Sequence, residues 1–107
     1  MLTGIGAPPL VRSQAPLFVD ATSTALVDAV GDVCSRFYAA NGDPVAFPGS
    51  ERLLALELSV LRGLPLVIAV AAGQDKVPAL IAAARAGYVT QLVTDPQTAE
   101  QLLDRSV

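Results

Sequence analysis

Lys76 is the residue whose position most directly suggests chemistry in this sequence. It follows Gly73 within the run VIAVAAGQDKVPALIAAARAGYVTQLVT, Val67 to Thr94. The run predicts a strand, a turn, an amphipathic helix and a second strand parallel to the first. Ligands of parallel sheets bind at the carboxyl ends of the strands, beside helix N-termini, so Lys76 is predicted to hold an anionic small molecule. A solvated surface lysine and a Schiff-base amine are the alternative interpretations.

Asp32 and Gly73 are the other candidate binding residues. Asp32 follows Gly31 at the start of a predicted strand, where its carboxylate could accept hydrogen bonds from ligand hydroxyls or bond to local turn amides. Gly73 is predicted to shape the turn, which would let a ligand approach the backbone.

Other polar residues are assigned mainly structural roles. Arg36 and Arg52 could reach a phosphate, but a surface or salt-bridge role is favoured for both. Thr94 with Gln97 forms a capping-box pattern, and Asp95 reinforces the helix start; contact with a ligand is the alternative for Thr94 and Asp95.

The elements that must position these residues follow from apolar patterning and turn signals. The sequence predicts strands at Leu2–Ile5, Val33–Tyr38, Leu66–Ala71 and Tyr88–Val93. It predicts a short helix from Asp20 or Thr22 to Val27 and a last helix in which Ala99, Leu102 and Leu103 are buried. It also predicts a crossover helix at Val77–Ala86, with Val77, Leu80, Ile81 and Ala84 as its apolar face. Ala7–Val19 is predicted to be a loop and Asn41–Pro44 a turn. Ser50–Leu64 fits either one helix or a strand at Arg52–Leu56 followed by a short helix.

Composition restricts the class of protein. The chain has 107 residues, of which 52% are hydrophobic and 16% charged, with a net charge of −3. Autonomous nucleic-acid binding is not expected, because it needs clustered Lys and Arg. There is no histidine and one cysteine, Cys34, which is expected to be a small buried hydrophobe, so neither a metal nor a cofactor is predicted. No apolar run reaches membrane-spanning length and the start lacks a secretory pattern, so a cytoplasmic protein is expected.

Two longer runs carry a resemblance to a known family. They are DAVGDVCSRFYAANGDPV and RLLALELSVLRGLPLVIAVAAGQDKVPALIAAARAGYVTQLVTDPQTAEQLL. Their ordered series of motifs resembles the carboxyl-terminal half of the sugar-binding domain of SorC/DeoR-type bacterial transcriptional regulators. Gly4-Ile5-Gly6 also resembles a strand end of that family. One departure is Ala72-Gly73, where the family pattern has two glycines.

The resemblance implies an α/β fold with a three-layer, Rossmann-like parallel sheet, similar to that of glucosamine-6-phosphate deaminase and ribose-5-phosphate isomerase. It resolves Ser50–Leu64 in favour of the strand at Arg52–Leu56 and a short helix. It implies that residues 1–107 form a partial sugar-binding domain without the family's helix-turn-helix, so that DNA would be contacted only through a region absent from this chain. In that family an acidic residue at the position of Asp32 faces the effector.

The resulting hypothesis is the effector-sensing part of a sugar-responsive transcriptional regulator that binds a phosphorylated sugar. An enzyme related to sugar-phosphate isomerases or deaminases is the first alternative, although no cluster suited to proton transfer is present. A truncated fragment without its own ligand, which associates with itself, is the second. Self-association is expected, because a half-domain with this apolar content should leave a sheet edge or a helix-facing surface exposed.

Overall fold

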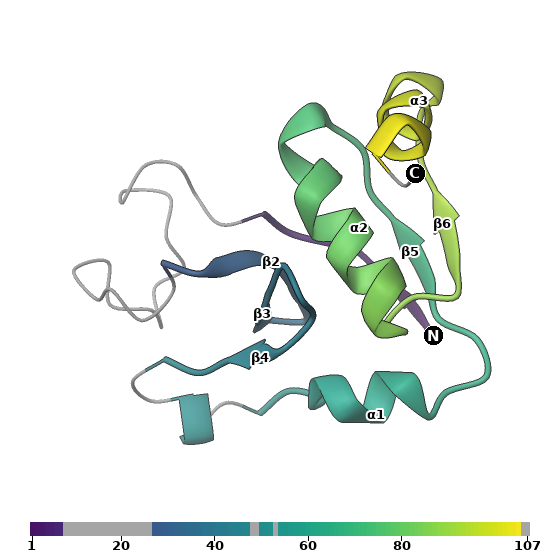
Figure 1. Cartoon of the computed structure of the whole chain (residues 1–107). Helices are drawn as coiled ribbons and strands as arrows, with labels where there is room; N and C mark the ends of the chain where they lie inside the picture. The colour runs from purple at the N-terminus through teal and green to yellow at the C-terminus, as the bar shows by residue number, and fades with distance from the viewer. Residues whose placement is uncertain (8–26, 48–49, 53, 106–107) are drawn as a thin grey trace.

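The computed structural model describes residues 1–7, 27–47, 50–52 and 54–105 (Figure 1). The expected loop after Ala7 and the expected short helix up to Val27 lie almost entirely outside these residues. In chain order the elements are β1 (Leu2–Thr3), β2 (Ala29–Val33), β3 (Arg36–Ala39), β4 (Pro44–Val45), the 3-10 turn η2 (Ser50–Arg52), α1 (Leu58–Arg62), β5 (Ile68–Val70), the 3-10 turn η3 (Gln74–Lys76), α2 (Val77–Ala86), β6 (Gln91–Val93) and α3 (Pro96–Arg105).

Strands β1, β5 and β6 form a parallel sheet in that order, with β5 in the centre. The predicted strand–helix–strand unit is confirmed, since β5 and β6 are parallel and α2 has the predicted bounds. A mixed α/β fold with a three-stranded parallel sheet is therefore confirmed. No helix in the described part of the chain has the length and apolar character needed to cross a membrane.

Both predicted strands of this unit are shorter in the structure than in the prediction. Tyr88 lies just after Gly87, the residue that ends α2, and belongs to the capping turn, because its amide donates to Ala83 O. Val67 precedes β5 and bonds to Thr90 through its amide and its carbonyl. Hydrophobic composition continues past the residues that pair, so it could not define the strand ends.

The prediction of a single strand from Val33 to Tyr38 is wrong. Residues 29–39 form a hairpin in which β2 pairs antiparallel with β3, and β3 then pairs with β4. The chain reverses at Cys34 and Ser35, whose φ angles are 51° and 67°. Two consecutive left-handed residues match the twist of a two-residue hairpin turn. Gly or Asn usually occupies such positions, so Cys34-Ser35 carries no turn signal. Cys34 is exposed at this turn, which corrects the expectation that it is buried.

The strand expected at Arg52–Leu56 is also absent from the described residues. Ser50–Arg52 form the 3-10 turn η2, and residues 54–57 belong to no regular element. The short helix expected after it is confirmed as α1, which ends at Gly63. Leu54 is fully exposed, whereas Leu58 and Leu61 are buried, so the leucines of this segment do not share one buried face.

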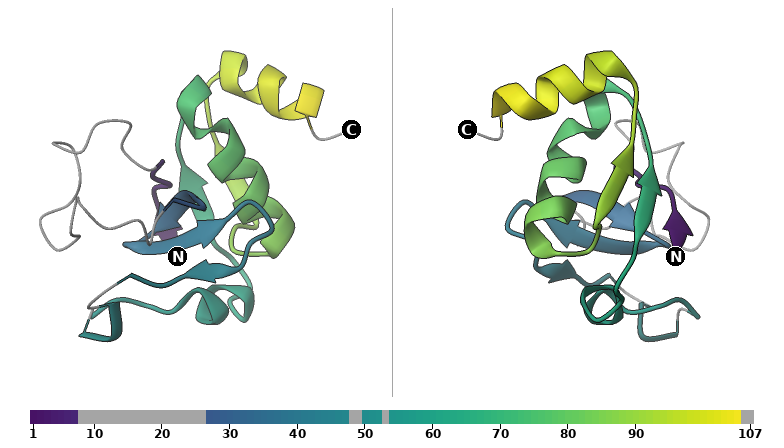
Figure 2. Two further views of the ribbon diagram at one scale, coloured as in Figure 1. Left: turned by 60° about the vertical axis from the view of Figure 1, so that its left-hand side comes forward. Right: turned by 90° about the vertical axis from the view of Figure 1, so that its right-hand side faces the viewer.

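Helix α2 packs on one face of the parallel sheet and also contacts strand β2 of the hairpin (Figures 1 and 2). Its predicted apolar face is partly wrong: Val77 and Leu80 are buried, but Ala84 is exposed and Ile81 is only partly buried. The structure buries three further alanines instead, Ala79, Ala82 and Ala83. A helix with neighbours on two sides needs a wider buried face than one apolar stripe, and small residues allow the close approach.

The hairpin is joined to α2 by Tyr38 of β3. The Tyr38 hydroxyl donates to Ala79 O at 2.8 Å, and the side chain is fully buried. Tyr88, two residues after the end of α2, packs on Tyr38 with ring centroids 5.6 Å apart and donates its hydroxyl to Gly42 O. These two tyrosines connect the antiparallel and parallel parts of the molecule.

Helix α3 begins differently from the predicted capping box. The cap is Asp95, whose Oδ1 accepts from the Thr98 amide at 2.7 Å. Hydrogen bonding by the Thr98 side chain, together with this amide, holds the pKa of Asp95 below its ordinary value. The Thr94 Oγ1 atom is buried and has no hydrogen-bond partner in the described part of the chain. Leu102 packs against the core, but Leu103 is 70% exposed, which corrects its expected burial.

Candidate functional site

The carboxyl ends of the parallel strands converge with the hairpin on one side of the molecule. β1 continues into Gly6, and β5 continues through Gly73 into η3 and α2. A pair of backbone hydrogen bonds, Gly6 N to Asp32 O at 3.0 Å and Asp32 N to Gly6 O at 3.1 Å, joins the chain after β1 to β2. This bridge brings Asp32 to the edge of the sheet where ligands of parallel sheets bind.

Asp32 and Lys76 lie within electrostatic reach of each other. Burial raises the pKa of Asp32, while the Ser35 amide and the positive charge of Lys76 oppose that rise. The Ser35 amide donates to Asp32 Oδ2 at 3.3 Å. One oxygen of the carboxylate is therefore used in the hairpin turn, as the alternative interpretation from the sequence predicts. No hydrogen bond to Oδ1 is found among the described residues.

Gly6 leaves the space that the Asp32 side chain occupies. A Cβ placed on Gly6 would lie 2.1 Å from Asp32 Oδ1, which is too close for any real side chain. In the sequence Gly4-Ile5-Gly6 resembles only a strand end, and nothing in it points to Asp32. The signal was weak because the two residues are distant in sequence and meet only through the bridge.

Lys76 is half-buried at the last residue of η3, immediately before α2. Its amide donates to Gly73 O at 3.1 Å, which closes the turn that precedes the helix. A positive side chain at this position adds to the field of the helix N-terminus, so the local environment favours an anion. The structure therefore places Lys76 at the strand-to-helix turn that the sequence predicted.

Gly73 has the backbone conformation φ 126°, ψ 144°, which is open mainly to glycine. Its amide donates to Thr98 Oγ1 at 2.9 Å, so that N–H is already engaged within the protein. Thr98 is the one buried polar side chain in the described part of the chain, and its role was not predicted from the sequence. In this geometry Gly73 shapes the turn and ties it to α3.

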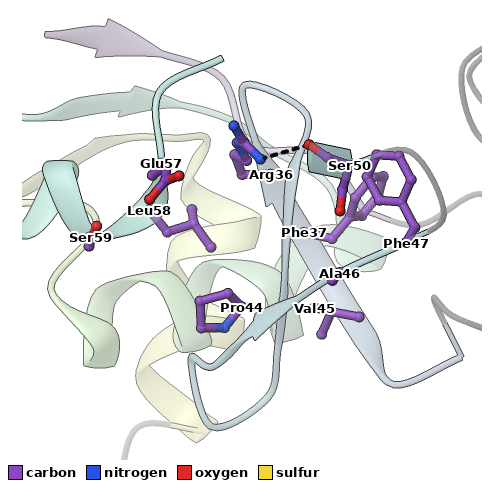
Figure 3. Close-up of a pocket in the computed structure, with 10 residues that line it drawn as sticks. All are labelled: Arg36, Phe37, Pro44, Val45, Ala46, Phe47, Ser50, Glu57, Leu58 and Ser59. Atoms are coloured by element: carbon purple, nitrogen blue, oxygen red, sulfur yellow. Dashed lines mark hydrogen bonds between the residues drawn. The ribbon is translucent and has the colours of Figure 1, made fainter. Parts of the chain in front are cut away.

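A separate cavity of about 270 Å³ lies between β3, β4, η2 and the start of α1 (Figure 3). Its wall is largely apolar, with Phe37 and Phe47 packed edge to face at 5.7 Å. Arg36 lies at its rim and donates to Ser50 O at 3.4 Å and to Ala55 O at 3.0 Å. None of Asp32, Gly73 and Lys76 lines this cavity.

The carboxyl ends of the parallel strands are a better candidate for a small-molecule site than this cavity. They combine a cation, a carboxylate and a helix N-terminus, whereas Arg36 is bonded to backbone carbonyls that hold η2 and the following segment in place. Arg52 is exposed at the end of η2. In the described residues no group of three or more Cys, Asp or Glu side chains could hold a metal ion.

The sequence and the fold of this chain both match a known protein family. Residues 2–104 match the family model described as "Putative sugar-binding domain". The chain is 41% identical over 73 residues to the sorbitol operon regulator of Klebsiella pneumoniae and 41% identical over 76 residues to the transcriptional regulator LsrR of Escherichia coli K12. These matches cover 68% and 70% of this chain but 23% and 24% of the relatives, so the chain spans about a quarter of their length.

Solved structures agree with the sequence relatives. A DeoR family transcriptional regulator from Listeria monocytogenes superposes with a TM-score of 0.82 and 28% identity, over 94% of this chain and 42% of that one. The chain therefore belongs to the sugar-binding domain family of SorC/DeoR-type transcriptional regulators, which confirms the resemblance noted in the sequence. Its relatives are regulators rather than enzymes.

Proposed function

We propose that this chain is the effector-sensing part of a sugar-responsive transcriptional regulator and binds a phosphorylated sugar at the carboxyl ends of β1 and β5. Lys76 pairs with the phosphate, and Asp32 accepts hydrogen bonds from sugar hydroxyls. Residues 1–107 act as part of a larger sugar-binding domain, and DNA is contacted by another region of the regulator. The protein acts in the cytoplasm, where sugar phosphates and DNA are both accessible.

One observation carries the proposal. The hairpin and the parallel unit, which are separate in sequence, bring the Asp32 carboxylate within the electrostatic reach of Lys76 beside the turn that leads into α2. A sugar phosphate has an anionic end and a hydroxyl-bearing body, and these two side chains supply a partner for each. The family match supports a sugar as the ligand. We infer from the resemblance that the sheet is related to that of glucosamine-6-phosphate deaminase and ribose-5-phosphate isomerase.

Titration followed by backbone amide NMR shifts tests the proposal, because it detects binding even at millimolar dissociation constants. Ribose 5-phosphate, glucose 6-phosphate and sorbitol 6-phosphate would each be compared with the unphosphorylated sugar. We expect little or no measurable binding by the 107-residue chain alone. In a sugar-binding domain completed around this segment, the phosphorylated forms should shift the amides of Gly6, Asp32 and residues 73–77. No shift at these amides of the completed domain up to about 20 mM of any of these ligands would contradict the proposal.

Two variants separate the roles of the charged residues. Lys76→Ala should weaken the phosphorylated sugar about ten- to a hundred-fold, since a charge-assisted contact is worth about 1.5–3 kcal/mol, and should leave the unphosphorylated sugar nearly unchanged. Asp32→Ala should weaken both forms alike.

Arg85→Ala is the matched control for Lys76→Ala. Arg85 is exposed in the last turn of α2, so its loss changes the net charge equally but far from the helix N-terminus. Equal losses for both sugars on removing Lys76, or equal effects of the two variants, would make Lys76 an ordinary surface lysine.

A further inference from the structure

The Thr98 side chain is a buried hydroxyl that both accepts and donates hydrogen bonds. It lies in the first turn of α3 and is 3% exposed. Its Oγ1 accepts from the Gly73 amide at 2.9 Å, which leaves the hydroxyl proton to be donated elsewhere. Hydrogen bonding from this side chain to Asp95 lowers the pKa of that carboxyl. Thr98 therefore connects a carboxylate at the start of α3 with the turn that follows β5.

Gly73 joins this contact to Lys76. Both polar groups of the Gly73 backbone are engaged, since the amide donates to Thr98 and the carbonyl accepts from the Lys76 amide at 3.1 Å. The φ of 126° and ψ of 144° at Gly73 lie in a region open mainly to glycine, and glycine is also the residue with the most freedom to leave it. Holding such a residue from outside lowers the conformational entropy of the turn. Thr98 holds it on the amide side.

The pairing of β5 with β6 does not extend to this turn. After the bond from the Ala71 amide to Val93 O, at 3.1 Å, the chain following β5 leads into η3 and α2, and the chain following β6 leads into α3. The start of α2 and helix α3 lie at the same end of the parallel sheet (Figures 1 and 2). The bond from Gly73 to Thr98 links these two segments where the strands have ended.

We propose that Thr98 is a positioning residue for effector binding, because through Gly73 it holds the turn that sets Lys76 at the N-terminus of α2. This inference rests on the sugar-phosphate site proposed above. A turn released from α3 moves the Lys76 ammonium relative to the phosphate and so weakens a contact that depends on the distance between two charges. Asp32 is held separately, by the backbone bridge to Gly6. Thr98 therefore acts on the phosphate end of the ligand and not on its hydroxyls.

Two substitutions at position 98 of the completed sugar-binding domain test this role by NMR titration. Thr98→Val keeps the branched shape of the side chain but leaves the Gly73 amide without its acceptor, whereas Thr98→Ser keeps the hydroxyl. The probes are ribose 5-phosphate, glucose 6-phosphate and sorbitol 6-phosphate, each with its unphosphorylated sugar. Thr98→Val should lower the affinity for a phosphorylated sugar about three- to ten-fold, the equivalent of one neutral hydrogen bond, and change that for the unphosphorylated sugar less than about two-fold. Thr98→Ser should restore most of the loss.

Lys76→Ala shows whether the effect passes through Lys76. In that background Thr98→Val should change the affinity for the phosphorylated sugar by less than about two-fold, because the group that Thr98 positions is gone. A general weakening of the fold would instead lower the affinity for both forms of the sugar in both backgrounds. That result would overturn the positioning role of Thr98.

Amide hydrogen exchange in the unsubstituted domain needs no variant and decides the matter if Thr98→Val does not fold. The phosphorylated sugar should slow exchange of the Gly73 amide at least about three-fold more than that of the Ala71 amide, which is bonded within the sheet. Equal slowing of the two amides, or an unchanged preference of Thr98→Val for the phosphorylated sugar, would overturn the role of Thr98 and leave the proposed function standing. A wild-type domain that binds none of the three sugar phosphates would contradict the proposed function and the role of Thr98 together.

Discussion

The parallel unit β5–α2–β6 and the antiparallel unit β2–β3–β4 differ in how far their local sequence specifies their structure. In the parallel unit β5 and β6 have only three residues each, but they flank the ten-residue helix α2, which buries five of its residues. In the antiparallel unit the strands have five residues or fewer, and the turn at Cys34 and Ser35 uses residues that seldom adopt left-handed backbone. The first unit is specified locally, whereas the second depends on contacts with the rest of the molecule.

The two units contribute different charges to the candidate site. The parallel unit supplies Lys76 at the turn before α2, and the hairpin supplies Asp32 beside Gly6. The distance between those charges is fixed by the docking of one unit on the other. A site of this kind should therefore be sensitive to substitutions at the junction, even where neither charged residue is changed.

The largest expected effect comes from breaking the junction at Tyr38. Tyr38→Ala should lower the free energy of unfolding by about 3–5 kcal/mol, because it removes a fully buried ring and the hydrogen bond to Ala79 O. Tyr38→Phe keeps the ring and should cost about 0.5–1.5 kcal/mol. Urea unfolding followed by circular dichroism measures both. A loss below about 1 kcal/mol for the alanine variant would show that the hairpin does not depend on this contact.

Gly6→Ala should disturb the second contact between the units. The new Cβ would displace the Asp32 carboxylate, at a cost of about 1–2 kcal/mol in unfolding and a further loss of sugar binding. Gly4→Ala is the control, because its Cβ would meet only Val70 O at 3.8 Å, and its effect should stay within about 0.5 kcal/mol. Denaturant unfolding of both variants gives the comparison, and equal effects would show that Asp32 can move without cost.

At the start of α3, one variant tests the observed cap, Asp95, and another tests the cap predicted from the sequence, Thr94. Asp95→Ala should cost about 1 kcal/mol, since it removes the acceptor for the Thr98 amide. Thr94→Val should be neutral or slightly stabilising, because the Thr94 hydroxyl is buried without a partner in the described part of the chain. Thermal unfolding can rank the two variants, and the reverse order would favour the capping box predicted from the sequence.

The smallest expected effect is a pH dependence that Asp32 alone confers. Its native pKa is raised by burial, so between the ordinary and the raised value the native state binds more protons than the unfolded state. The free energy of unfolding should then fall as the pH rises through that window. Asp32→Asn removes this contribution. As the pH rises through that window, the free energy of unfolding of the variant should therefore increase relative to that of the wild type. A difference that is constant with pH would contradict the raised pKa.

The sequence by itself determined the parallel β5–α2–β6 unit, the short helix α1, the position of Lys76 and the family. Each of these depends on local periodicity, turn residues or an ordered series of motifs within one continuous segment. Strand ends were less well predicted, because apolar composition extends beyond the residues that pair, as at Tyr88.

Only the tertiary structure decided the hairpin at Cys34 and Ser35, the irregular segment after η2 and the environment of Asp32. The hairpin turn tolerates left-handed residues because Tyr38 and the Gly6–Asp32 bridge hold its strands in place. The cap at Asp95 and the burial of Thr98 likewise depend on how α3 meets Gly73. Such features arise from contacts between residues that are distant in the chain, and the stabilisation that selects them has no signature in local sequence.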